Sequence, residues 1–310
     1  MNGVLRSMLE ATGDSSRFVG DNGTETNPWA IEDTYDFMNM DSKNNGLQEV
    51  CFMLKNNIDF NDHEQYKLGW SNTSADKKLY CDYTRFDGDG KQIRNLVIKG
   101  INFDISNSER WKLKNLYNTH FVNLVDLDCK RGGSKWLVVS GECKNNSFNI
   151  MHFSQTHLWN VIPANSIGCS YNLAYNSSDD INIGNSNTAY LEFERCWINL
   201  DNCSSNAYSV LRCVDFKNCC VTGSFTPLKT GIDFAYYARA TSSMFAVKVN
   251  TESVIKIPSS DWFTTTGINI IDKEIAHIDK ASTATVKYLT TAEMKDTSIL
   301  QGYGFPVVRG

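Results

Sequence analysis

The chain has 310 residues, of which 41% are hydrophobic and 21% are charged, and its formal net charge is −5. This balance is typical of a folded globular protein and excludes wholesale disorder. Lys and Arg are scattered along the chain, so the clustered basic surface needed for duplex DNA or anionic lipid is not expected. We therefore predict no nucleic-acid partner.

The N-terminal stretch Met1–Gly13 carries one Arg and no apolar run of the length found in secretory signals, and no later stretch has the length of a membrane-spanning helix. We expect neither a signal peptide nor a membrane span. Ten cysteines in a chain of this kind indicate reduced thiols, and the sequence contains no C-x-x-C pair that would favour structural zinc. Several cysteines are predicted to lie in the core as small buried hydrophobes: Cys129, Cys143, Cys169, Cys196 and Cys213.

Residues 1–53 differ in pattern from the rest of the chain and are expected to form an N-terminal attachment segment and cap. Thr34 to Met40 has the pattern of a short helix, and Val50 to Leu54 that of a strand before a polar turn at Asn56-Asn57. Such a cap is needed where the first coil of a solenoid would otherwise expose apolar core and unpaired strand edges.

Residues 54–254 predict a parallel β-helix, because short alternating runs succeed one another with Asn, Asp, Ser and Gly between them. The clearest runs are Asn95–Ile105, Thr119–Cys129, Ser147–Phe153, Ala189–Leu200 and Val210–Phe225. Comparable positions recur at steps near 22 to 26 residues, for example Phe103, Leu127 and Phe153, which is the period of a solenoid.

The abundance of Asn fits coil corners, because Asn tolerates the left-handed conformation and its amides form ladders between coils. A β-sandwich is the alternative, but it would require tight hairpin signals, and Asn22-Gly23 and Asn45-Gly46 both precede the repeat region. The predicted fold class is therefore all-β, a right-handed parallel β-helix with an N-terminal cap and a small C-terminal α+β extension.

Residues 255–310 form the predicted extension. Thr290-Thr291-Ala292-Glu293 has the spacing of a capping box, which indicates a short helix running to about Leu300 and ending near Gly302.

Paired acids are the candidate catalytic residues if the protein is an enzyme. The pairs Asp126/Asp128 and Glu192/Glu194 have the i, i+2 spacing that places both carboxyls on one face of a strand, as glycoside hydrolysis requires, and Asp179-Asp180 is a third candidate. A solvated face explains them equally well. A lyase would need a basic residue, for which Lys130-Arg131 is the local candidate.

Metal and cofactor signals are weak. Asp87-Gly88-Asp89-Gly90 resembles a calcium loop, but Arg85 and Leu96 occupy the positions where an EF-hand needs ligands, so a glycine turn is favoured. His63, His120, His152, His157 and His277 do not have metal-ligand spacing. We predict no metal and no cofactor.

Two segments resemble a known family: GTETNPWAIEDTYDFMNM at Gly23 to Met40, and LKNNIDFNDH from Leu54 leading to FDGDGKQIRNLVIKGINF at Phe86 to Phe103. They are similar to the opening of pectate-lyase-like β-helices in surface proteins of Bacteroidetes-type bacteria and in their phages. The ending, Gly267 to Val308, resembles C-terminal segments of virion proteins from crAss-like gut phages. The resemblance implies a fibre, spike or other appendage protein.

The resulting hypothesis is a non-enzymatic structural component of a phage virion, a rigid shaft that assembles as a homo-oligomer, with a trimer as our guess, and contacts other virion proteins. It would be made in the host cytoplasm. The alternatives are a tailspike-like glycan depolymerase and a glycan-binding adhesin, either of which would contact host surface glycan.

Overall fold

The computed structural model describes residues 22–38, 40, 49–60, 68–69, 79–80, 84–99, 111–127, 137–151, 165–174, 183–184, 191–251, 255–256, 263–274, 278–279 and 286–304. The chain divides into two compact units, Met1–Ile150 and Met151–Gly310. In both, short strands stack in parallel on strands of the next coil, which makes the protein an all-β solenoid as predicted. No helix among these residues has the length and apolarity to cross a membrane.

The described part of the first unit holds three parallel sheets and one short helix, α2 (Thr34–Met38). The strands of its first sheet, in hydrogen-bonded order, are β1 (Trp29–Ile31), β2 (Val50–Leu54), β6 (Thr84–Asp87), β10 (Asn115–Tyr117) and β13 (Cys143–Lys144). Those of the second are β3 (Ile58–Asp59), β7 (Gln92–Arg94), β11 (His120–Leu127) and β14 (Ser147–Met151), with β4 (Leu68–Gly69) joined to β11 through β8 (Val97–Lys99). The third contains β5 (Leu79–Tyr80), β9 (Trp111–Leu113) and β12 (Leu137–Val139).

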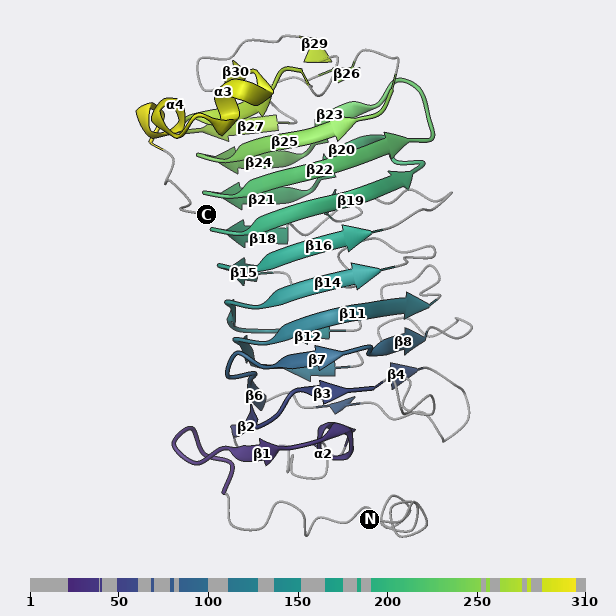
Figure 1. The fold of residues 1–310 in the computed structure, drawn as a ribbon, viewed down its shortest axis with the longest axis vertical. Helices are drawn as coiled ribbons and strands as arrows, with labels where there is room; N and C mark the ends of the chain where they lie inside the picture. Colours follow the sequence, from purple (N-terminus) through teal and green to yellow (C-terminus); the bar gives the residue numbers. More distant parts are fainter. Residues whose placement is uncertain are drawn as a thin grey trace. The chain divides into compact units, whose positions relative to one another are not determined.

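The second unit also has three parallel sheets (Figure 1), named here by one strand of each. The β18 sheet contains β15 (Asn165–Ile167), β18 (Leu191–Glu194), β21 (Val214–Lys217), β24 (Ala238–Thr241) and β27 (Phe263–Thr266). The β19 sheet contains β16 (Ser170–Ala174), β19 (Trp197–Ser205), β22 (Cys220–Pro227), β25 (Met244–Val249), β28 (Asn269–Asp272) and β30 (Val286–Leu289). The β20 sheet contains β17 (Ile183–Gly184), β20 (Ser209–Arg212), β23 (Asp233–Tyr236), β26 (Ile255–Lys256) and β29 (Ile278–Asp279).

Coil corners are closed by buried side chains that accept a hydrogen bond from the preceding coil. The Cys219 thiol accepts from the backbone N–H of Cys196, 23 residues earlier, and the Ser243 hydroxyl accepts from Cys219, 24 residues earlier. Asn269 accepts from Ser243, 26 residues earlier, and Asn146 in the first unit accepts from Thr119, 27 residues earlier. The steps of 23, 24 and 26 residues in the second unit fall within the predicted 22 to 26 residues, whereas the step from β16 to β19 is 27 residues, from Ser170 to Trp197.

Left-handed residues turn the chain between strands. Asn95, Asn118, Asn145 and Asn218 lie between strands and all have positive φ, which confirms the predicted role of Asn at corners. Asn202 also has positive φ, but it lies inside β19, where the register with β22 shifts. Ladder contacts also occur, since the Asn199 side-chain amide donates to the Asn172 Oδ1 at 2.6 Å. Two runs that the sequence joins are divided in the structure: Ala189–Leu200 breaks at Arg195 (φ 53°) and Val210–Phe225 breaks at Cys213 (φ 50°).

Aromatic rings from successive coils stack inside each unit. Phe193 and Phe216 lie parallel with ring centroids 5.4 Å apart, and Phe216 meets Phe245 edge to face at 5.6 Å. In the first unit, Phe37 from α2 is fully buried. The centroid of its ring lies 5.6 Å from that of Phe60 and 6.0 Å from that of Phe86. The predicted helix at Thr34 and strand at Val50–Leu54 are both confirmed, and α2 contributes its aromatic ring to the core.

The C-terminal capping box is present, but the predicted helix is two helices. The Thr290 hydroxyl accepts from the Glu293 N–H at 3.1 Å, the Glu293 carboxylate accepts from the Thr290 N–H, and α3 spans Thr291–Lys295. Asp296 has extended φ and ψ, ends α3 and caps α4 (Thr297–Gly302) by accepting from the Ser298 N–H. Asp296 therefore divides into two helices the segment that the sequence pattern predicts as one.

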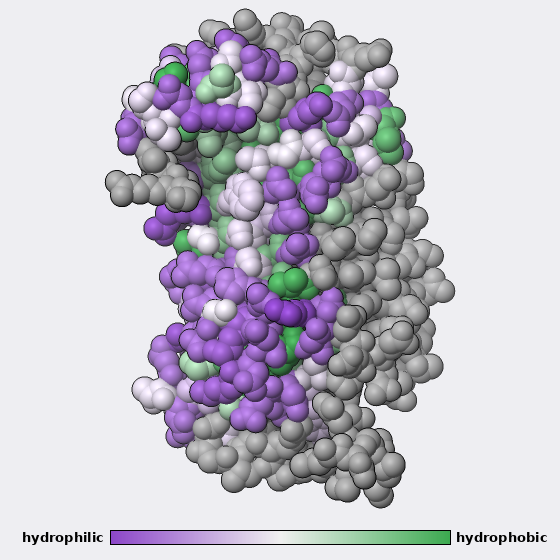
Figure 2. Space-filling model, in the orientation of Figure 1, coloured by the Kyte–Doolittle hydropathy of each residue, from purple (hydrophilic) through white to green (hydrophobic). Residues whose placement is uncertain are grey.

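Helices α3 and α4 pack against the β19 sheet. Ile270, Leu289 and Met294 form a buried apolar cluster there, against which the half-buried Met244 and Ala246 also pack. On the face seen in Figure 2, apolar surface gathers beside these helices, while the coloured surface of the first unit is mostly hydrophilic. The parallel pairing continues past residue 254 through β27, β28 and β30.

Candidate functional site

The acidic pair Glu192/Glu194 lies on β18, and both side chains are on the outward face while Phe193 between them is buried. In register, Glu192 pairs with Asp215 and Glu194 with Lys217 on β21. Glu194 is half-exposed and forms an ion pair with Arg195 at 3.3 Å. The predicted shared face is therefore present, and its surroundings are a charged outer face of the solenoid.

The other acidic candidates are not brought together by the described structure. Asp126 belongs to β11, but its side chain lies outside the described residues, and so do Asp128, Asp179, Asp180 and the Lys130-Arg131 pair. Of the five histidines, only His120 lies within the described ranges, where its Nδ1 is 2.8 Å from the Ser147 hydroxyl.

The Asp87–Gly90 segment is a glycine turn. The Asp87 carboxylate accepts from the Asp89 N–H at 2.9 Å and from the Asn118 amide at 3.1 Å, and Asp89 forms an ion pair with Lys91. Asp89 and Gly90 have positive φ, as the turn interpretation requires. Within the described ranges, no group of three or more His, Cys, Asp or Glu side chains is arranged to hold a metal ion.

Four of the five predicted core cysteines are buried, and Cys129 lies outside the described residues. Hydrogen bonding with the Cys169 and Cys219 thiols, together with burial, raises the pKa of the Cys196 thiol. Burial raises the pKa of Cys213, and that of the half-buried Cys220 to about 11. A thiol that stays protonated is a poor nucleophile and a poor metal ligand, so these cysteines act as core packing.

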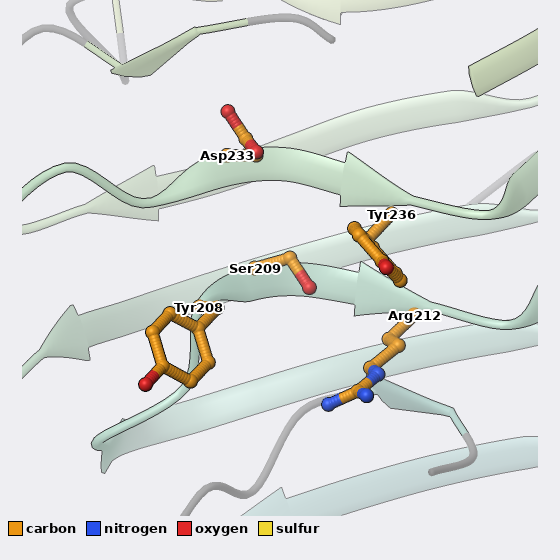
Figure 3. A pocket seen from close by; sticks show the side chains of 5 residues that line it. All are labelled: Tyr208, Ser209, Arg212, Asp233 and Tyr236. Atoms are coloured by element: carbon orange, nitrogen blue, oxygen red, sulfur yellow. The ribbon is translucent and has the colours of Figure 1, made fainter. Parts of the chain in front are cut away.

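A cavity of about 280 Å³ on the β20 sheet is a candidate site that described residues line. Its lining residues are Tyr208, Ser209, Arg212, Asp233 and Tyr236 (Figure 3). Four of them come from two neighbouring parallel strands, β20 and β23, whose register places Ser209 beside Asp233 and Arg212 beside Tyr236. The fully buried Leu211 and Ala235 lie in the same strands and anchor them to the core.

Tyr208 precedes β20 and stands 64% exposed at the rim of this cavity. Its carbonyl accepts a hydrogen bond from the Asp233 N–H at 2.9 Å, which ties the rim to the next coil. The Lys229 ammonium lies 4.0 Å from the centre of the Tyr208 ring, and the Arg212 guanidinium lies 5.5 Å from that of Tyr236. Each tyrosine of the lining thus has a cation over its ring.

The Ser209 hydroxyl is buried at the cavity wall and has no hydrogen-bond partner within the described part of the chain. Figure 3 shows Ser209 between Tyr208 and Arg212, with the Asp233 carboxylate directed away from the Arg212 guanidinium. Aromatic faces, a buried hydroxyl and a guanidinium are groups that bind polar rings.

Sequence reasoning did not identify this site. Tyr208 and Tyr236 are far apart in the chain, and only the register between coils brings their strands together. The usable signal is the enrichment of this segment in tyrosine, with Tyr236-Tyr237 adjacent and Tyr208 one coil earlier.

Comparison with known proteins gives a structural likeness. No protein-family model matches the chain, and no curated protein matches it either. A crystal structure described as that of "a putative immunoglobulin A1 protease from Bacteroides ovatus" superposes with a TM-score of 0.46 and 15% identity, over 94% of this chain and 92% of that one. This similarity is too low to transfer any property from that protein.

Proposed function

We propose that this protein is a non-enzymatic β-solenoid that binds a saccharide through the cavity formed by Tyr208, Ser209, Arg212, Asp233 and Tyr236. The observation that carries the proposal is the arrangement of two tyrosines and a guanidinium around a cavity on a rigid parallel sheet. Sugar rings bind proteins by stacking their apolar faces on aromatic rings and by hydrogen bonding through their hydroxyls. Both kinds of group are present here.

Binding is favoured over hydrolysis because, among the residues that the structure describes, a single carboxylate lines this cavity. Glycoside hydrolysis needs two carboxyl groups flanking the scissile bond, one of them with a raised pKa. Asp233 is the acid at the cavity, while Glu192 and Glu194 belong to the β18 sheet and not to the β20 sheet. A tailspike-like depolymerase remains the alternative that an activity assay addresses.

The test is saturation-transfer NMR of the full chain against a panel of host surface oligosaccharides, with reducing-sugar release followed in parallel. We expect saccharide binding without product, and loss of binding in Tyr208→Ala. The control is Trp197→Ala, which removes another aromatic side chain, half-exposed at 50%, from β19. Sustained release of reducing sugar would show that the protein is a depolymerase and not only a binding protein. If no oligosaccharide of the panel binds, the proposal of saccharide binding is overturned.

A second candidate function is structural: the solenoid serves as a rigid component of a phage virion, a fibre, spike or head appendage. The supporting observation is the parallel pairing of every coil with its neighbour inside each unit, reinforced by buried corner hydrogen bonds. The first third resembles β-helices of bacterial surface proteins and of phages, and the C-terminal segment resembles that of phage virion proteins, which is why we propose a virion.

This candidate predicts self-association into a homotrimer and a place among other virion proteins. Light scattering of the purified chain would then give about 105 kDa for three 35.0 kDa chains. Mass spectrometry of purified particles would detect the protein at fixed copy number. A monomer that is absent from particles would contradict the structural role without affecting saccharide binding.

A further inference from the structure

We propose that the cavity on the β20 sheet selects one terminal sugar residue that carries a carboxylate, with Arg212 as the group that recognises the charge. This inference rests on the proposed saccharide-binding function and goes further by naming the ligand class and the residue that reads it. Three observations carry it: the size of the cavity, the charge around it and the buried hydroxyl in its wall.

The size of the cavity favours a single ring. Ligand pockets for drug-sized molecules occupy roughly 300 to 1,000 Å³. At about 280 Å³ this cavity falls just below that range, a size that favours one sugar residue over a run of them. If only one sugar residue fits the cavity, that residue is the terminal one of a glycan chain, and the rest of the chain stays in solvent.

The charge around the cavity favours an anion. Arg212 lines the wall, and Lys229 lies over the Tyr208 ring at the rim. Of the described lining residues one is acidic, Asp233, and Figure 3 shows its carboxylate directed away from Arg212. A guanidinium presents a planar pair of N–H donors that matches both oxygens of a carboxylate, which a neutral sugar hydroxyl cannot use in the same way.

The buried hydroxyl supplies a polar contact for the ring. Ser209 is 1% exposed, and its oxygen lies in the cavity wall without a hydrogen-bond partner in the ranges that the structure describes. Buried hydroxyls ordinarily find a partner, because an unmade hydrogen bond costs stability. A sugar hydroxyl placed in the cavity would satisfy it, while the largely exposed Tyr208 ring offers a stacking face at the rim.

The experiment compares each acidic sugar with its own methyl ester, which keeps the ring and removes the charge. Titration of the full chain with N-acetylneuraminic acid, glucuronic acid and galacturonic acid, each against its ester, gives the ratio of the two dissociation constants by chemical-shift perturbation. We expect at least one acid to bind about tenfold more tightly than its ester, the size of one charge-assisted bidentate contact.

Variants at Arg212 locate the discrimination. Arg212→Gln should reduce the acid-to-ester ratio to about one while leaving ester binding in place, and Arg212→Lys should give an intermediate ratio because the charge remains and the fork is lost. Arg239→Gln, which removes an exposed arginine from β24, is the matched control and should leave the ratio unchanged. Circular dichroism and thermal melting establish that each variant is folded.

The outcomes separate this inference from the proposed function. Equal binding of acid and ester, or a preference unchanged in folded Arg212→Gln and Arg212→Lys, overturns the acidic-sugar class while saccharide binding stands. If no acid, ester or neutral oligosaccharide binds, both proposals are overturned. A ratio that falls in Arg212→Gln and persists in Arg239→Gln supports the assignment.

Discussion

The Cys219 thiol lies 3.4 Å from the backbone nitrogen of Cys196, one coil earlier, and accepts its hydrogen bond. One coil later the acceptor is the hydroxyl of Ser243, and then the amide oxygen of Asn269. Thiol, hydroxyl and amide therefore serve the same purpose at successive corners: each satisfies a buried N–H that the turn of the chain removes from the strand ladder.

Removing one of these acceptors should destabilise the second unit. Ser243→Ala leaves the buried Cys219 N–H without its acceptor and removes the bond from the Ser243 hydroxyl to the Thr241 carbonyl. We expect a loss of about 1 to 3 kcal/mol in the free energy of unfolding, the usual cost of a buried unpaired donor. Urea denaturation followed by circular dichroism measures it. Ser224→Ala, whose hydroxyl bonds the exposed Asn202, is the control and should change stability by less than about 0.5 kcal/mol.

A pair of glycine substitutions tests the packing between β19 and β22. Gly223 has φ of +100°, and a Cβ built on it would collide with the carbonyl of Leu200 on the neighbouring strand. Gly223→Ala should therefore cost about 2 to 4 kcal/mol, since backbone on both sides has to move. Gly231 also has positive φ, but nothing lies within 4 Å of a Cβ built on it. Gly231→Ala should therefore cost only the backbone strain of a left-handed alanine, about 1 kcal/mol. Equal effects of the two substitutions would contradict the close approach.

The capping box at the start of α3 should make the stability of the C-terminal helices depend on pH. Hydrogen bonds from the Thr290 backbone N–H and hydroxyl lower the pKa of Glu293 in the folded protein. Its stabilising contribution is therefore fully present above the unfolded pKa, near 4.5, and is lost as the pH falls through the lower folded value. Thr290→Ala should cost about 1 kcal/mol at neutral pH and flatten this acid-side decline. Thermal melting between pH 3 and pH 7 compares the variant with the wild type, and an unchanged profile would exclude the cap as its source.

Thiol reagents should react slowly with the native protein. Seven of the eight cysteines in the described ranges are buried, and the eighth, Cys220, is half-buried with a pKa raised to about 11. Because the thiolate is the reactive form, labelling of Cys220 at pH 8 should be far slower than that of a free thiol and should accelerate towards pH 11. Peptide mass spectrometry after timed alkylation resolves each site, with urea-unfolded protein as the fully reactive reference. Rapid native labelling of Cys196 or Cys219 would show that the corner opens.

The sequence was sufficient to predict the solenoid because its period and its corner residues are local signals. Asn95, Asn118 and Asn145 take the left-handed conformation that their side chains tolerate, and the spacing of the coils is set by the chain itself. Arg195 and Cys213 take the same conformation without a propensity for it, so the strand breaks there could not be predicted. In these places the packing of neighbouring coils outweighs the preference of the residue.

The candidate site was beyond sequence reasoning for a related reason. Arg212 and Tyr236 meet because two coils stack in one particular register, and neither residue lies in a motif. The acidic pair Glu192/Glu194 shows the opposite case: its i, i+2 spacing correctly predicts a shared strand face, but spacing does not reveal that Arg195 pairs with one of the two acids. The alternation of apolar and polar residues along a strand predicts which face a side chain occupies. Which residues lie beside it on the neighbouring coils depends on the register between strands.

The direction of the corner hydrogen bonds has a consequence for biosynthesis. In each case the backbone N–H belongs to the earlier coil and the accepting side chain to the later one, as in Cys219 and Ser243. A ribosome releases the earlier coil first, so that coil remains unfinished until the next one has emerged and laid its corner against it. The nascent solenoid therefore grows with one open turn at its leading end, and arrest of translation at any coil would leave that turn exposed to chaperones or to neighbouring chains.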